Sequence, residues 1–134
     1  MGIASTFDST TTTSTTTTTA AYEDFVTYKY VQGDTGPQIR LTFTDEDTGL
    51  ATNLTGATVT LHFRAKGSTT VLFSRELFIN PETAANGVAI LAWDEGDLEQ
   101  TPGNYEGEVE VVRSTGVRET LFDVLAFQIR ADFA

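Results

Sequence analysis

The stretch ATVTLHFRA, residues 57–65, decides the fold because its apolar side chains recur at every second position. The apolar members are Val59, Leu61 and Phe63. Polar or charged residues stand between them, so one face of the segment is apolar and the other is polar. A period of two is typical of a β-strand with one face in the core.

The same alternation continues along the chain, in short runs bounded by turn residues. The further runs are residues 25–31, 38–44, 70–80, 87–93, 104–113 and 119–133. Seven strands at this spacing predict an all-β domain over residues 25–134, an immunoglobulin-like β-sandwich of about seven strands. Small barrels have similar strand spacing, so a closed barrel stays open as an alternative.

A Pro-Gly turn precedes a tyrosine near the start of a late strand, in the segment Pro102-Gly103-Asn104-Tyr105. Immunoglobulin-like folds place a tyrosine corner there, with the ring in the core and the hydroxyl bonded to nearby backbone. The single tryptophan ends the preceding strand, and we expect it to cover the core. The predicted core signature is Tyr105, Trp93, Val59, Leu61, Phe63, Ile39, Leu41 and Phe127.

Residues 1–24 form a Thr/Ser-rich segment with few apolar side chains. It cannot bury enough surface to offset its ordering entropy alone, but threonine is β-branched and favours extended backbone. We therefore expect an extended arm that pairs with a neighbouring subunit. The residues expected to serve assembly are Ile3, Phe7, Thr11, Thr15 and Thr19. A flexible leader is the alternative.

Charge and composition exclude several partners and sites. The chain has 8 Lys and Arg against 19 Asp and Glu, a net charge of −11, which disfavours nucleic acid and anionic membranes. Cysteine is absent, so disulfides and thiolate chemistry are excluded. No secretory signal and no apolar run of the ~20 residues that a spanning helix needs are visible. We expect a soluble product made in the cytoplasm.

The catalytic inventory is small. His62 is the only histidine and lies on the polar face of its strand, which favours a surface histidine over a general base. One histidine without thiols does not support a zinc site. The sequence predicts no enzyme and no cofactor. A row of Glu106, Glu108 and Glu110 on one strand face must be solvated or paired with a basic partner.

Two acidic loops carry hard oxygen ligands. Asp45 and Asp47 lie in one of them, and Asp94 and Asp97 lie in the other. Calcium prefers such oxygens, but neither loop has the spacing of a helix-loop-helix site. Aspartate is also common in solvated turns. The sequence leaves both interpretations open.

Several segments occur in an order that resembles the N-terminal domain of the baseplate upper protein family of tailed bacteriophages. The resemblance covers about residues 30–133. The matching positions are Gly33-Asp34, Leu54-Thr55-Gly56-Ala57, Val59, Trp93, Asp97, Pro102-Gly103, Tyr105 and Glu108. The resemblance implies an immunoglobulin-like virion domain without catalytic activity.

The expected function is therefore that of a bacteriophage virion structural protein, docked on the particle through its N-terminal arm and strand edges. It would be a tail, baseplate or neck component, or a capsid decoration protein. Its partners would be other head, neck or tail subunits, in a homo- or hetero-oligomer, and it would be located in the virion after synthesis in the host bacterial cytoplasm. The alternative is a carbohydrate- or host-surface-binding module on the virion, with Phe7, Tyr22, Phe25, Tyr28 and Tyr30 as candidate contact residues.

Overall fold

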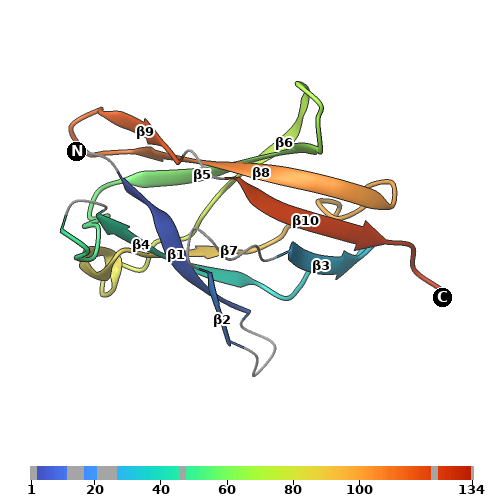
Figure 1. The fold of residues 1–134 in the computed structure, drawn as a ribbon, viewed down its shortest axis with the longest axis horizontal. Helices are drawn as coiled ribbons and strands as arrows, with labels where there is room; N and C mark the ends of the chain where they lie inside the picture. The colour runs from blue at the N-terminus through green and yellow to red at the C-terminus, as the bar shows by residue number, and fades with distance from the viewer. Residues whose placement is uncertain (1–2, 12–16, 21–26, 46–47, 122–123, 134) are drawn as a thin grey trace.

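The computed structural model describes residues 3–11, 17–20, 27–45, 48–121 and 124–133 (Figure 1). For residues 3–11, 17–20 and 45 it describes the backbone alone. These residues form two β-sheets, which confirms the predicted all-β, immunoglobulin-like sandwich. No helix among them has the length and apolar character needed to cross a membrane.

The smaller sheet has four strands in the order β2-β1-β4-β7. Their bounds are β1 Ile3–Thr11, β2 Thr17–Ala20, β4 Ile39–Asp45 and β7 Val88–Leu91. All three pairings in it are antiparallel. A 3-10 turn, η1 at Ala84–Asn86, precedes β7.

The larger sheet has six strands in the order β3-β10-β8-β5-β6, with β9 paired beside β8. Their bounds are β3 Thr27–Val31, β5 Thr58–Ala65, β6 Val71–Glu76, β8 Gly103–Val112, β9 Arg118–Thr120 and β10 Leu125–Arg130. The parallel pair of β3 with β10 joins the two ends of the domain. The described residues thus form ten strands, since residues 119–133 contribute two and the N-terminal segment adds β1 and β2.

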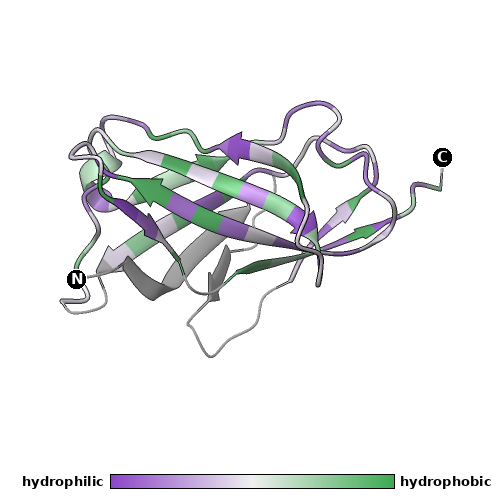
Figure 2. Ribbon diagram, turned by 90° about the horizontal axis from the view of Figure 1, so that it is seen from above, coloured by the Kyte–Doolittle hydropathy of each residue, from purple (hydrophilic) through white to green (hydrophobic). Residues whose placement is uncertain are grey.

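The core lies between the sheets, and Figure 2 shows hydrophobic and hydrophilic residues alternating along the strands. Each of the eight residues of the predicted core signature is buried. Trp93 lies edge-on to the rings of Tyr30, Phe63 and Phe127, at centroid distances of 5.3, 5.9 and 5.6 Å. The tryptophan therefore joins both strands of the parallel pair to β5 through ring contacts.

The predicted tyrosine corner is present at the start of β8. The Tyr105 hydroxyl donates a hydrogen bond to the backbone carbonyl of Thr101, four residues upstream. Its ring stacks on Phe63 with centroids 5.1 Å apart. Burial raises the pKa of Tyr105. This bond fixes the loop that enters β8 to the sandwich core.

The N-terminal segment has a backbone partner within the same chain. Strand β1 runs antiparallel to β4, with Phe7 opposite Phe43, and β2 pairs with the other edge of β1. Ile3 and Thr11 lie at the ends of β1, and Thr19 lies in β2. Thr15 falls outside the described residues. Part of residues 1–24 thus extends the smaller sheet of the sandwich rather than leaving it.

Candidate functional site

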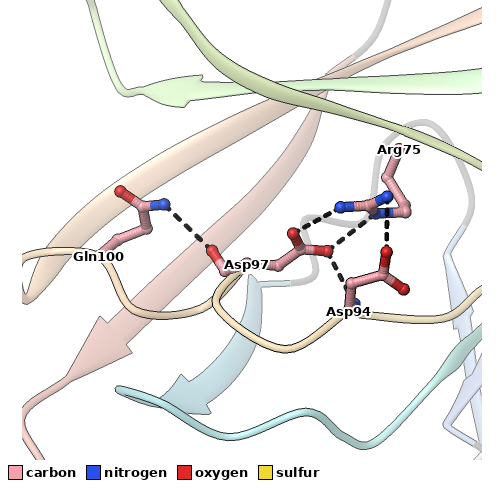
Figure 3. A network of polar contacts seen from close by, with 4 residues as sticks. All are labelled: Arg75, Asp94, Asp97 and Gln100. Carbon is pink, nitrogen blue, oxygen red and sulfur yellow. Dashed lines mark hydrogen bonds and ion pairs between the residues drawn. The ribbon is translucent and has the colours of Figure 1, made fainter.

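A guanidinium–carboxylate network joins β6 to the loop between β7 and β8 (Figure 3). Arg75 binds Asp97 with two hydrogen bonds, Nε to Oδ2 at 2.9 Å and Nη2 to Oδ1 at 2.7 Å. Its Nη1 also lies 2.9 Å from Oδ2 of Asp94. Hydrogen bonding to Asp97 raises the pKa of Arg75 above its ordinary value. A bidentate pair of this kind fixes orientation as well as charge.

The Asp97 carboxylate is almost completely buried and also organises its own loop. Its Oδ2 accepts a hydrogen bond from the Asp94 backbone at 2.8 Å, and its backbone carbonyl accepts one from Gln100 at 3.1 Å. The following Leu98 is fully buried. These contacts make Asp97 a structural residue that holds a loop against β6.

The Arg75 network involves one of the two acidic loops that were considered as calcium sites. Asp94 and Asp97 direct carboxylate oxygens at Arg75, so their loop is organised by a guanidinium. The side chains of Asp45 and Asp47 lie outside what the structure describes. Among the side chains that it does describe, no group of three His, Cys, Asp or Glu residues is placed to hold a metal ion.

A second polar cluster lies on the outer face of the larger sheet, across β6, β5, β8 and β9. His62 Nδ1 lies 2.6 Å from the Ser74 hydroxyl, and its Nε2 lies 3.5 Å from Oε1 of Glu110. Arg118 donates to the other oxygen of Glu110 at 3.2 Å. Sequence analysis singled out His62 but missed Ser74, which faces it from the neighbouring strand.

The order Ser–His–Glu has the elements of a nucleophilic triad, but its position works against catalysis. Acyl transfer requires preorganised hydrogen-bond donors aimed at the developing oxyanion. Ser74, His62 and Glu110 all project from strands, whose backbone N–H groups lie in the plane of the sheet. Those donors cannot converge above the sheet face. The cluster therefore suits cross-strand stabilisation.

The predicted acidic row on β8 is compensated within the chain at two of its three positions. Arg64 Nη2 lies 3.1 Å from Oε1 of Glu106, and Arg118 and His62 approach Glu110. Glu108 is exposed between them. This face therefore presents paired charges, which removes most of the reason to expect a basic partner there.

The edge strand β6 exposes apolar side chains that the sequence analysis did not single out. Val71 and Leu72 are 49% and 46% exposed. Phe73 is half-buried and stacks on Phe63 with centroids 4.8 Å apart. Figure 1 shows β6 at the margin of the larger sheet, with the β5–β6 turn extending beyond its neighbours. A run of three consecutive apolar residues was the available signal, because strict alternation would interrupt it.

The aromatic residues proposed for carbohydrate contact do not form a surface patch. Tyr28 and Tyr30 are buried in the core. Tyr30 donates to the Pro37 carbonyl at 2.9 Å. The side chains of Phe7, Tyr22 and Phe25 lie outside what the structure describes. The sugar-binding alternative therefore loses two of its five candidate residues.

No protein-family model matches the chain, and no curated protein matches it. Among solved structures, it is similar to CopC from Methylosinus trichosporium OB3b, with 11% identity and a TM-score of 0.45 over 81% of this chain and 89% of that one. It is also similar to the PmoD soluble domain from Methylocystis sp. ATCC 49242 (Rockwell), with 15% identity and a TM-score of 0.43 over 96% and 90% of the two chains.

These findings correct the family and functional expectations. The two similar structures named above are CopC and a PmoD domain rather than phage baseplate proteins, and no family model, that of the baseplate family included, matches the chain. The predictions of a baseplate upper protein relative, a virion structural function, head, neck or tail partners and a virion location are therefore wrong. The alternative of a sugar- or host-binding module on the virion is likewise unsupported. The motif order was misleading because its pieces are turn and strand segments that many sandwiches share.

Proposed function

We propose that this chain is a non-catalytic binding domain that presents the outer edge of β6 to an extended polypeptide segment. The observation that supports this proposal is an edge strand with two exposed apolar side chains. A bidentate ion pair holds this strand in place. Extended segments bind such edges by adding a strand, with affinity from backbone hydrogen bonds and specificity from alternate side chains.

The backbone of β6 has one side turned outward. Leu77 donates to the Val59 carbonyl at 2.8 Å, which marks that pair as hydrogen-bonded. Antiparallel ladders alternate, so the backbone groups of Phe73 and Arg75 face β5 while those of Ser74 and Glu76 face away. Within the described part of the chain, β6 pairs along its length with β5 alone. Ser74 and Glu76 thus offer donors and acceptors to an added strand.

The Arg75 network prepares this edge for binding. It fastens the C-terminal end of β6 to the loop that contains Asp94 and Asp97. On the same face, the Phe73 ring rests on the core residue Phe63. A preformed edge loses less conformational entropy on binding than a mobile one. The polar cluster of Ser74 and His62 adds a further cross-strand contact on the opposite face.

A strand peptide tests the binding proposal. The probe is a synthetic peptide with the sequence of residues 70–79, TVLFSRELFI, titrated into the isotope-labelled protein. We expect NMR shift changes and slower amide exchange at Ser74 and Glu76. The variant Glu76→Pro, which removes an outward N–H, should abolish the response, whereas Glu76→Gln should keep it. Changes confined to other strands would contradict the proposal.

The absence of catalysis is tested separately. A fluorophosphonate probe modifies serines that an adjacent base activates, and intact mass reports the adduct. We expect none on Ser74, because the sheet face offers no convergent oxyanion donors. The matched control is Ser74→Ala. An adduct that forms on the native protein and is lost in Ser74→Ala would overturn this part of the proposal.

A further inference from the structure

We infer that the segment bound at this edge is β6 of a second copy of the chain, so that two domains join their larger sheets around a two-fold axis. This inference rests on the proposed function and names the partner. Two copies of one strand related by a two-fold axis perpendicular to the sheet run antiparallel automatically. The contact is self-complementary and closes at two subunits.

The side chains select the position of the axis. With the axis at Ser74, the outward backbone groups of both copies meet, and Phe73 lies opposite Arg75 of the second copy. Within one copy, the guanidinium carbon of Arg75 already lies 6.0 Å from the Phe73 ring centre. The second contact would therefore repeat a compatible cation–aromatic pair. An axis at Arg75 would instead place two guanidiniums directly opposite each other, which is destabilising.

Charge permits this contact in spite of the net charge of −11. Arg75 is compensated by Asp94 and Asp97, so no row of like charges faces the edge of β6. At the other margin of the larger sheet, β3 exposes Lys29 in the middle of the strand. A lysine on an edge strand disfavours pairing with another chain. The second copy therefore fits β6 better than β3.

The apolar side chains give the same preference. Val71 and Leu72 lie at the start of β6, where an irregularity shifts the pairing with β5, and each is about half exposed. A second β6 would cover part of both. The charges of Arg75, Asp94 and Asp97 are paired with one another, so this network offers no free charge that would attract a strongly charged partner.

Single cysteines locate the contact, because the chain contains no cysteine. Residues that form a hydrogen-bonded pair across an antiparallel ladder have Cα atoms about 5.5 Å apart, within the range that a disulfide spans. With oxidised glutathione as oxidant, Ser74→Cys should give a covalent dimer on a non-reducing gel. The matched control is Gln128→Cys, exposed on β10. It should stay monomeric. Equal cross-linking of both variants would overturn the inference.

Sedimentation equilibrium measures the association without a cross-link. We expect the native chain and Glu76→Gln to dimerise, and Glu76→Pro to associate at least tenfold more weakly. If Glu76→Pro fails to fold, the Ser74→Cys result decides. A native chain that stays monomeric to about 1 mM, together with no Ser74→Cys dimer, overturns the second copy as partner. The proposed function then stands if the peptide of residues 70–79 still binds at Ser74 and Glu76, and both fall if it does not.

Discussion

Asp97 shows why a residue type alone did not reveal its role. Within the sequence it belongs to an acidic loop, which is compatible with a solvated turn or a calcium ligand. In the structure its carboxylate is buried and held by Arg75, 22 residues earlier. No local pattern joins the two, because the contact depends on how β6 and the β7–β8 loop meet. A buried carboxylate requires a partner, so the loop can bury Asp97 only because Arg75 pairs with it.

The Arg75 contact predicts a large cost when it is removed. Arg75→Met keeps much of the side-chain volume but leaves the buried Asp97 carboxylate without its guanidinium. We expect a loss of about 2–4 kcal/mol in the free energy of unfolding, measured by urea denaturation. The control Arg118→Met breaks a pair whose arginine is 69% exposed and should cost less than about 1 kcal/mol. Similar small losses in both variants would show that the network contributes little.

The buried hydroxyl of Tyr30 leads us to predict that the stability of the chain falls at alkaline pH. Burial raises the pKa of its hydroxyl in the folded chain, whereas the unfolded chain titrates near 10. Above that pH the unfolded state loses the proton and the folded state keeps it, so stability falls as pH rises. Tyr30→Phe removes the hydrogen bond to the Pro37 carbonyl, so its free energy of unfolding at pH 7 should be about 1 kcal/mol lower than that of the native chain. Between pH 10 and 11.5 its stability should fall less steeply than that of the native chain; parallel curves would contradict this.

Individual strands were the most predictable part of the fold. Alternation in residues 38–44, 57–65 and 104–113 corresponds to β4, β5 and β8, because one buried face imposes a period of two. Pairing between distant strands has no such local signature. The parallel contact of β3 with β10 joins segments about a hundred residues apart. The contacts among Ser74, His62 and Glu110 likewise depend on the pairing of β5 with β6 and with β8.

For a glycine inside β8 we predict that replacement by alanine destabilises the domain. Gly107 faces the core, and a Cβ there would overlap the Leu61 side chain and lie 2.9 Å from Cε2 of Phe127. Alanine normally stabilises a strand relative to glycine, but here overpacking should dominate. Gly107→Ala should cost about 1–3 kcal/mol in thermal or urea unfolding. At Gly36 a Cβ meets nothing within 4 Å, so Gly36→Ala should be near neutral. A stabilised Gly107→Ala would refute the packing argument.

At the scale of the whole molecule, composition was informative about charge but not about its arrangement. The net charge of −11 and the alternating glutamates of residues 106–110 predicted an acidic face, yet at least four of the eight cationic residues pair with carboxylates in the described chain. The N-terminal segment likewise has the composition of a disordered leader. Its extended threonines are nevertheless compatible with two strands beside β4, since backbone pairing requires no particular side chain.

The pairing of β1 with β4 makes a prediction about individual amides. Phe43 donates to the Gly87 carbonyl on the β7 side. By alternation, the amides of Arg40 and Thr42 face β1. In the full chain these two should therefore exchange slowly with solvent, as measured by NMR hydrogen exchange. Rapid exchange at both, with protection retained at Phe43, would show that β4 lacks a neighbour on that side.

Two proline substitutions in β1 separate its two neighbours. Asp8 lies opposite Thr42 in the hydrogen-bonded register, whereas the backbone of Ser9 turns toward β2. Proline at position 8 removes the N–H that faces the Thr42 carbonyl and puts its ring between β1 and β4, which separates the Thr42 amide from the Asp8 carbonyl. Asp8→Pro should therefore accelerate exchange at Thr42 by at least tenfold, whereas Ser9→Pro turns the ring toward β2 and leaves Thr42 unchanged. The larger sheet reports whether the damage stays local: the Leu61 amide, on β5 between β6 and β8, should keep its protection in both variants. If Ser9→Pro exposes Thr42 as strongly as Asp8→Pro does, β1 does not hold this register. If Leu61 loses protection as well, the N-terminal strands and the larger sheet unfold as one cooperative unit.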